Sequence, residues 1–370
     1  MSILFKNAML LMPSGKFTEG DLLIKGEKIA CVGVANHEDA FTVIDCTGKY
    51  ITPGFIDAHC HVGILEEGKG EAGDDTNESS EVVTPQIKGE DGVNPFDKGF
   101  EDALRAGVTT VVTGPGSANV IGGTFCALKT VSGSLEDKRL VPNVGLKVAL
   151  GENPKRIHKD KIKTRMGCAA ILREALQKGV LAAKNGSSDS GEQTLAKVIS
   201  GELPLKIHAH RADDILTAIR ICKEFGVKYT VDHCSEGYLI ADKLKKDDVA
   251  CIIGPTLITR LKVELDGISM ANGAILEQNG IECAITTDHP ETPIGLLAAS
   301  AAVAVRGGMS KEAALRAITV NPARLCGLDN VGELAPGKDA DIVVFDTHPL
   351  DICAMPRQVY VLGKLQAENP

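Results

Sequence analysis

The sequence predicts an α/β fold: a (β/α)8 TIM-type barrel that carries a small β-sandwich domain formed by both termini. Three observations favour it. The middle of the chain alternates strand-like apolar runs with helix-forming stretches, both ends are rich in short strands, and 370 residues suffice for one barrel and one accessory domain. We therefore expect a composite β-sandwich domain at 1–52 plus 330–370, and a barrel domain at 53–329.

The two ends of the chain share a pattern of short apolar runs separated by turn residues such as Pro13-Ser14-Gly15 and Gly26-Glu27. This pattern is typical of strands and hairpins. The runs lie at 2–11, 21–25, 28–34, 341–346 and 358–362. Because chain termini often lie close together, one β-domain built from both ends is expected.

The middle of the chain contains eight strand-like runs, which predict eight parallel strands closed into a barrel. The runs lie at 54–59, 109–113, 124–131, 143–149, 205–210, 228–233, 250–254 and 282–288. Helix-forming stretches lie between them, at 96–106, 165–184, 212–225 and 292–306. The glycine-rich stretch 114–123 is expected to be a loop at the barrel mouth.

The amino-acid composition limits the kinds of partner that the protein is expected to bind. The net charge of −9 and the pI of about 5.6 leave no excess of basic charge for nucleic acid or anionic lipid. No run approaches the ~20 apolar residues of a membrane span, and the first residues do not form a secretory signal. Eleven cysteines without disulfide or CxxC zinc spacing indicate reduced thiols, so we expect a cytoplasmic protein.

Histidines and one aspartate stand where the predicted barrel strands end. His59 and His61 end the first strand, and alternation places both on one face. His210 ends the fifth strand, His233 the sixth and Asp288 the eighth. An isolated HxH pair would more often be two polar residues that close a strand than a metal site. The whole group, however, consists of metal-ligand types at the C-terminal ends of strands, where such barrels carry their sites, and it predicts a metal centre.

These segments resemble the amidohydrolase superfamily. The resemblance is carried by PGFIDAHCH in the first strand, HAHRADD and DH in the fifth and sixth, TTDHP in the eighth, and the C-terminal NPARLCGLDNVGELAPGKDADIVVFD. Within the superfamily, HAHRADDI and GLKVALGENPKR are most similar to imidazolonepropionase-related and prolidase-like members. The resemblance spans nearly the whole chain and implies a barrel that interrupts a small β-sandwich.

The resemblance also implies roles for single residues. His59 and His61 match the first-strand ligand pair, and His233 matches the sixth-strand histidine. Asp288 matches the eighth-strand aspartate, which binds metal and moves a proton.

Two further ligand positions are implied less directly. His210 matches the fifth-strand ligand because Asp213 follows it by three residues, and His208 on the same face is its rival. Lys147 matches the fourth-strand lysine that binuclear members carboxylate. A carbamate offers an anionic oxygen ligand, whereas an ammonium cannot bind a cation. The alternative is an unmodified lysine that reaches solvent.

The implied activity is metal-dependent hydrolysis of a C–N bond in an amide, a cyclic amide or a dipeptide. One or two divalent cations, with zinc the expected ion, would lower the pKa of bound water towards ~7. Asp288 would accept the proton and pass it to the leaving nitrogen. His233 would bind the second metal, or donate to the substrate carbonyl if one metal is present. The alternatives are a deaminase or lactone hydrolase on the same barrel, and a non-catalytic scaffold, which the filled ligand positions disfavour.

Four residues are weaker candidates for substrate contacts. Arg165 and Arg211 could hold a carboxylate, although most arginines are surface charges. Asn119, in the glycine-rich loop, could contact substrate, and His208 could do so if it is not a ligand. The expected partner is a small-molecule substrate, and homo-oligomers are expected because they are common in the family.

Overall fold

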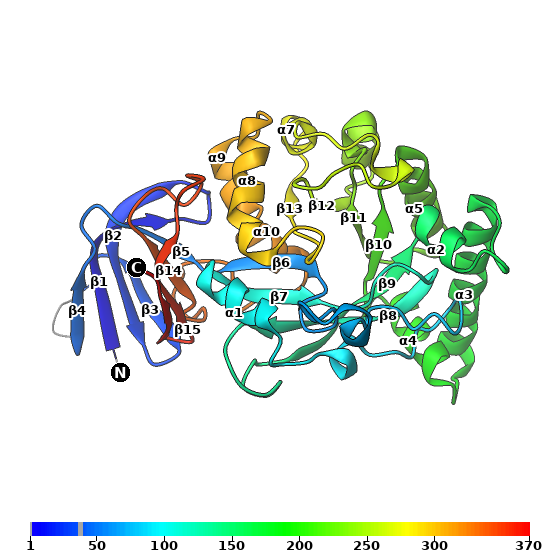
Figure 1. Ribbon diagram of the computed structural model, residues 1–370, viewed down its shortest axis with the longest axis horizontal. Helices are drawn as coiled ribbons and strands as arrows, with labels where there is room; N and C mark the ends of the chain where they lie inside the picture. The colour runs from blue at the N-terminus through cyan, green and yellow to red at the C-terminus, as the bar shows by residue number, and fades with distance from the viewer. Residues whose placement is uncertain (1, 36–39) are drawn as a thin grey trace.

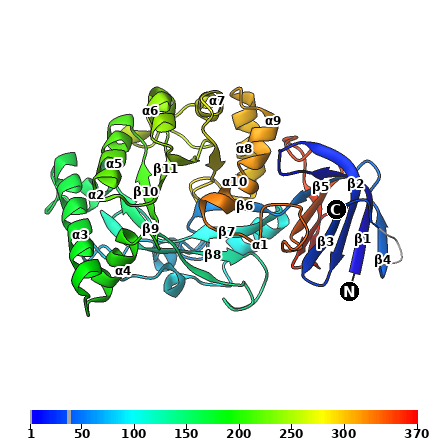
Figure 2. The ribbon, with the colours of Figure 1, turned by 180° about the vertical axis from the view of Figure 1, so that it is seen from behind.

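The computed structural model describes residues 2–35 and 40–370. Figures 1 and 2 show two parts side by side: a β-sheet domain that contains both ends of the chain, and a larger α/β part that contains the remaining strands and the helices.

Strands from both ends of the chain pair in one sheet. Its order is β16-β15-β14-β5-β1-β2-β3, with β4 paired to β1. The link between the two ends is the antiparallel pairing of β14 with β5. Alternate side chains of these strands, including Phe5, Leu22 and Ile342, form a buried core of their own. The sandwich form of this domain stays a prediction. The strands are β1 (Ser2–Leu11), β2 (Phe17–Lys25), β3 (Lys28–Gly33), β4 (Thr42–Asp45), β5 (Tyr50–Pro53), β14 (Ile342–Phe345), β15 (Pro356–Val361) and β16 (Lys364–Glu368).

A second eight-stranded sheet forms a nearly closed barrel, in the order β13-β12-β11-β10-β9-β8-β7-β6. The chain closes the gap between β13 and β6 through backbone bonds: Ile285 N donates to Ala317 O at 2.8 Å, and Ile56 N donates to Ile318 O at 2.9 Å. The strands are β6 (Phe55–Cys60), β7 (Val108–Thr113), β8 (Ile121–Lys129), β9 (Val141–Ala149), β10 (Leu205–Ala209), β11 (Tyr229–His233), β12 (Ala250–Ile253) and β13 (Cys283–Ile285).

The expectation of eight parallel strands is wrong at β8, which runs antiparallel to both β7 and β9. The physical reason is the length of its connections. A parallel neighbour needs a crossover of a dozen or more residues, usually a helix. No helix lies between β7 and β8 or between β8 and β9, and residues 114–120 join β7 to β8 directly.

The helices follow the remaining barrel strands and lie outside them (Figure 1). They are α1 (Lys98–Arg105), α2 (Glu152–Ile157), α3 (Arg165–Asn185), α4 (Ser190–Ile199), α5 (Ala212–Phe225), α6 (Ala241–Lys246), α7 (Asn272–Gln278), α8 (Leu297–Arg306), α9 (Lys311–Arg316) and α10 (Val320–Leu325). The predicted helices at 96–106, 165–184 and 212–225 correspond to α1, α3 and α5. The predicted helix at 292–306 begins later, with a 3-10 turn followed by α8.

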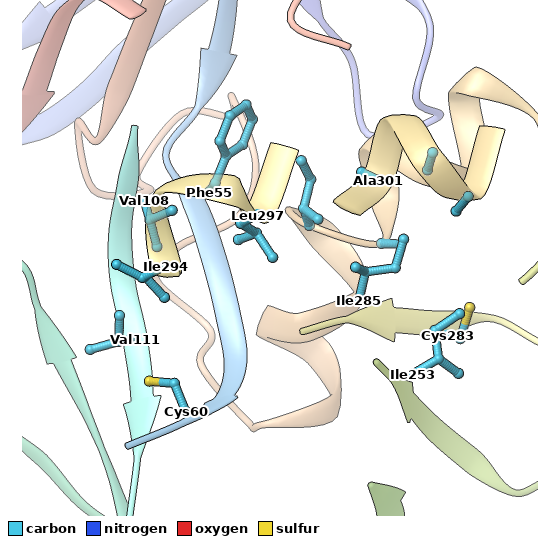
Figure 3. Close-up of a cluster of buried hydrophobic side chains, with 14 of the residues drawn as sticks. Phe55, Cys60, Val108, Val111, Ile253, Cys283, Ile285, Ile294, Leu297 and Ala301 are labelled. Carbon is cyan, nitrogen blue, oxygen red and sulfur yellow. The ribbon is translucent and has the colours of Figure 1, made fainter. Parts of the chain in front are cut away.

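Apolar side chains fill both faces of the barrel wall. Figure 3 shows Ile285 near Ala301 of α8 and Ile253 beside Cys283, in one cluster with Leu297 at the start of α8. A separate cluster, which includes Ile56, Ala58, Val112, Phe125, Ile252 and Ala284, groups strand residues with α10 and the segment after it. This packing fixes the strand ends, and with them the polar side chains that the ends carry.

No helix in the described part of the chain is long and apolar enough to cross a membrane. All eleven cysteines are free thiols, and nine of them are buried.

Candidate metal centre

The residues predicted for a metal site converge at the C-terminal ends of the barrel strands. His59 lies on β6, Lys147 on β9 and His208 on β10, while His233 ends β11 and Asp288 follows β13. His59 and Lys147 are 0% exposed and His233 is 1% exposed, so the group lies inside the protein.

Backbone conformation turns two of these side chains at the strand ends. His233 has φ 75° and Asp288 has φ 52°, a left-handed conformation that residues other than glycine seldom adopt. Such conformations gather at functional sites, where the surrounding structure holds them.

One group of ligand atoms comes from His59, His233 and Asp288, and lies within 4.8 Å of one another. Asp288 Oδ1 is 3.7 Å from His59 Nε2 and 3.3 Å from His61 Nε2. Lys147 Nζ is 3.1 Å from His59 Nε2. Four predicted ligands and the fourth-strand lysine thus meet at one point.

A second group comes from His208, His210 and His233, again within 4.8 Å. The ring centroids of His208 and His233 are 4.5 Å apart, and those of His210 and His233 are 4.6 Å apart. His233 belongs to both groups, so the arrangement offers two adjoining positions for a cation. Both rivals on the fifth strand, His208 and His210, take part in the second.

The outer ring nitrogens of these histidines have oxygen partners. His61 Nδ1 donates to Gly114 O at 2.8 Å, and His233 Nδ1 donates to Gly254 O at 2.9 Å. His59 Nδ1 lies 2.5 Å from Asp232 Oδ2. A partner that accepts from Nδ1 fixes the tautomer and leaves Nε2 free as a ligand, an arrangement typical of metal-binding histidines.

Burial keeps the histidines neutral. It holds the pKa of His59, His208 and His233 well below 6.5 and lowers the pKa of His210 to about 3. Burial also lowers the pKa of Lys147 to about 8. A neutral imidazole has a free lone pair, so the group can bind a cation without first losing protons.

The carboxylate of Asp288 has a buried oxygen that makes no hydrogen bond to the described residues. Burial alone would raise its pKa, but His233, His61 and Lys147 lower it overall, so the carboxylate is charged. Its Oδ1 is buried and has no hydrogen-bond partner among the described residues. Buried polar atoms are rarely left unpaired, and a cation between this oxygen and the imidazoles would satisfy it. The residues present therefore fit a divalent metal.

A cavity of about 380 Å³ opens onto this centre. The predicted residues that line it are His61, Lys147, His208, His233 and Asp288, whereas His59 and His210 lie behind its wall. The volume is that of a small-molecule site.

The structure does not bring the other predicted substrate contacts to this cavity. Arg165 Nε binds both oxygens of Asp214 at 3.0 Å, and Arg211 pairs with Asp213 on the surface. Asn119 donates to Glu78 O and Thr84 Oγ1 and accepts from His158 Nε2, so its amide ties three loops together. It lines a neighbouring cavity of about 390 Å³.

Three buried residues beside the centre were missed by the sequence patterns. Asp232 binds His59 and also pairs with Lys206 Nζ at 2.9 Å. Glu264 Oε1 lies 3.4 Å from His208 Nε2 and 3.9 Å from His210 Nε2. The DH pair at 232–233 was a usable signal for Asp232. Glu264 follows no strand, and nothing in its segment marks it.

Comparison with curated proteins finds relatives of several activities. The chain is 26% identical over 90% of its length to an amidohydrolase, tasK, of Hapsidospora irregularis, and 28% identical over 92% to an adenine deaminase of Listeria monocytogenes. It spans only 38% and 54% of those two proteins. A dihydroorotase of Lactobacillus leichmannii is 25% identical over 94% of the chain and 89% of its own length.

Two solved structures define the fold further. An amidohydrolase from Thermotoga maritima MSB8 is 39% identical, with a TM-score of 0.94 over 99% of this chain and 100% of that one. A Xaa-Pro dipeptidase with methionine bound in its active site shares the fold, at a TM-score of 0.64 and 16% identity over the full length of both chains. The model of the amidohydrolase family matches residues 50–367. The chain therefore belongs to the amidohydrolase family.

Proposed function

We propose that the protein is a metal-dependent hydrolase of a C–N bond in an amide, a cyclic amide or a dipeptide. The observation that carries the proposal is the convergence of neutral histidines on a charged, unpartnered oxygen of Asp288. Family membership and the hydrolases among its relatives support the same reaction class.

Zinc is the proposed ion, because imidazole and carboxylate are among its usual ligands. His59, His61 and Asp288 would hold one ion, and His208 or His210 with His233 would hold a second. When bound, the metal supplies an activated water and polarises the substrate carbonyl.

We further propose that Lys147 is carboxylated. Its Nζ is buried 3.1 Å from His59 Nε2, where an ammonium would repel a cation. Addition of CO2 to the neutral amine, with release of one proton, would replace that charge by an anionic carbamate. The carbamate oxygens could then bind a metal on each side.

In the proposed hydrolysis, Asp288 acts as the general base. It accepts a proton from the attacking water and delivers it to the leaving nitrogen, as the amine departs and the acyl group becomes a carboxylate. His233 would bind the second metal through Nε2, and it would donate to the carbonyl oxygen, if only one metal is present, only when both of its ring nitrogens carry a proton. The substrate is a small molecule, and we expect the enzyme to be a homo-oligomer.

Elemental analysis of protein purified with bicarbonate tests the metal centre. About two equivalents of metal per chain support the binuclear site with carboxylated Lys147, and about one equivalent leaves Lys147 unmodified. Protein that binds neither zinc nor manganese after reconstitution contradicts the proposal.

Asp288→Asn tests the base. The variant should keep the fold and lose at least about 100-fold in kcat, the scale of general base catalysis. Asp213→Asn, a surface change, is the control. Full activity of Asp288→Asn on the same substrate would exclude the proposed role.

A deaminase is the second candidate, because similarity to an adenine deaminase covers 92% of the chain. The two activities differ in product. A deaminase releases ammonia from an exocyclic amine, whereas the proposed hydrolase releases a larger amine or opens a ring.

A further inference from the structure

Among the described residues that line the cavity over the metal centre, one cationic side chain has no ionic partner. Lys147 is attracted by the carboxylates of Asp288 and Asp232, and Lys262 Nζ binds Glu264 Oε1 at 2.7 Å. Arg156 of α2 also lines the cavity, and its guanidinium has no hydrogen bond or ion pair to any residue in the described ranges.

The same helix carries a buried amide, that of Asn153, three residues before Arg156. Asn153 is 9% exposed and lines the same cavity, and its Nδ2 donates to Ser117 Oγ at 2.8 Å. Its Oδ1 is buried without a partner among residues 2–35 and 40–370. Leaving such an acceptor unpaired costs free energy, so a ligand that donates to it would be bound favourably.

Asn153 and Arg156 are placed so that one ligand could contact both. Asn153 and Arg156 are three residues apart on α2, a spacing that places them on one side of the helix. A planar guanidinium with five donors suits a carboxylate, which it can bind through two parallel hydrogen bonds. An amide oxygen suits an N–H donor. The pair is thus matched to a ligand in which an N–H and a carboxylate are close neighbours.

We propose that Asn153 and Arg156 bind the leaving-group side of the substrate, and that the substrates are N-acyl α-amino acids, dipeptides among them. This proposal rests on the proposed function. The N–H of the scissile amide donates to Asn153 Oδ1, and the α-carboxylate pairs with Arg156. Water then adds to the acyl carbon, the C–N bond breaks, and the amino acid leaves with the proton delivered to its nitrogen.

The acidic residues of the cavity are compatible with this ligand. Asp74 accepts from Thr76 N at 3.1 Å, and Asp288 belongs to the metal centre. Glu291 is exposed and lines the cavity, so its carboxylate could bind the free amino group of a dipeptide. The cavity of about 380 Å³ is large enough for such a molecule.

The test compares matched pairs of substrates on the zinc-loaded enzyme. Each pair is a dipeptide or N-acetyl amino acid and its C-terminal amide, which keep the same scissile bond and differ in one negative charge. Release of the amine gives kcat and KM. We expect the free acids to be preferred by roughly 10-fold or more, because charge-assisted hydrogen bonds to the carboxylate are lost in the amides.

Substitutions assign that preference to Arg156. Arg156→Met should lower kcat/KM for the free acids by roughly 10- to 100-fold, mainly through KM, and bring the acid-to-amide ratio close to one. Arg156→Lys should recover part of the loss, because it keeps the charge without the planar fork. Lys155→Met is the matched control: it removes a cation from the same helix outside the cavity lining, and should leave the ratio unchanged.

The outcomes separate this subsite from the reaction itself. Hydrolysis of acids and amides at equal rates, or an unchanged ratio in Arg156→Met, overturns the subsite and leaves the hydrolase intact. Hydrolysis of uncharged cyclic amides alone does the same. Absence of turnover on acids, amides and cyclic amides by metal-loaded protein overturns the proposed function, and the subsite with it.

Discussion

Asp232 connects the metal centre to a buried ion pair below it. It is 0% exposed, lies 2.5 Å from His59 Nδ1, and pairs with Lys206, which is 2% exposed. Thr230 Oγ1 donates to its other oxygen at 2.6 Å. The carboxylate therefore orients His59 and at the same time neutralises a lysine that has no access to water.

Asp232→Asn should weaken metal binding by roughly 10- to 100-fold, because His59 loses the carboxylate that fixes its ring. It should also lower the free energy of unfolding of the metal-free protein by about 3–5 kcal/mol, because Lys206 is left as an unpaired buried charge. Metal titration against a chelator and denaturant unfolding measure the two effects.

The double variant Asp232→Asn/Lys206→Met separates them. Removing both charges should restore much of the stability, since no buried charge is left alone, without restoring metal affinity. Wild-type affinity in Asp232→Asn would show that Asp232 has no part in orienting His59.

The contrast between His233 and Asp232 shows what residue patterns can predict. His233 was predicted because it ends a strand, as were His59, His61 and Asp288. Asp232 was not, because only the last residue of the strand was considered, although its neighbour in the DH pair was a usable signal. In the structure both side chains reach the centre, and His233 has the left-handed φ of 75°. Nothing in the residue types around 233 predicts that conformation.

At the scale of elements, the strands were predictable in position more than in direction. Each of the eight predicted barrel runs overlaps a strand of the structure, because apolar runs bounded by turn residues mark strands well. The direction of β8 depends on the length and structure of the segments that connect it to β7 and β9. The absence of a helix in 114–123 and 130–140 was visible in the sequence, and by itself favours antiparallel neighbours.

The packing around β8 yields a prediction about Gly123. A Cβ built there would lie 2.4 Å from Ile87 O, a backbone atom that cannot move without shifting its loop. Gly123→Ala should therefore reduce the free energy of unfolding by about 1–3 kcal/mol, as overpacking does. Gly92→Ala is the control, because the nearest atom to its Cβ is 3.9 Å away. Equal unfolding midpoints for the two variants would contradict the close packing of this loop on β8.

At the scale of the whole molecule, a buried ion pair joins the two sheets. Lys129 at the end of β8 is 6% exposed and pairs with Asp341 and, at 2.9 Å, with Asp339, both just before β14. Phe55 of β6 packs on Phe345 of β14 with ring centroids 5.8 Å apart. The barrel and the terminal sheet therefore share part of one core, which their separate places in the sequence did not predict.

Lys129→Met should destabilise the protein by about 3–5 kcal/mol, because it leaves the buried carboxylate of Asp341 without its ionic partner. Unfolding should remain a single transition, since the shared core couples the two sheets. Lys49→Met, which breaks an exposed pair with Asp346, should cost less than about 1 kcal/mol. Calorimetry that resolves two transitions in the wild-type protein would refute this coupling.

The pairing of β5 with β14 has a consequence for biosynthesis. Ile342 of β14 binds opposite Pro53 of β5, and the whole barrel is translated between them. At typical elongation rates the ribosome needs on the order of tens of seconds for that stretch. During this time the nascent chain presents the edge of β5 without its neighbour, and an unpaired strand edge is a template for aggregation. In a cell, the early strands are therefore the segment on which a chaperone would act first.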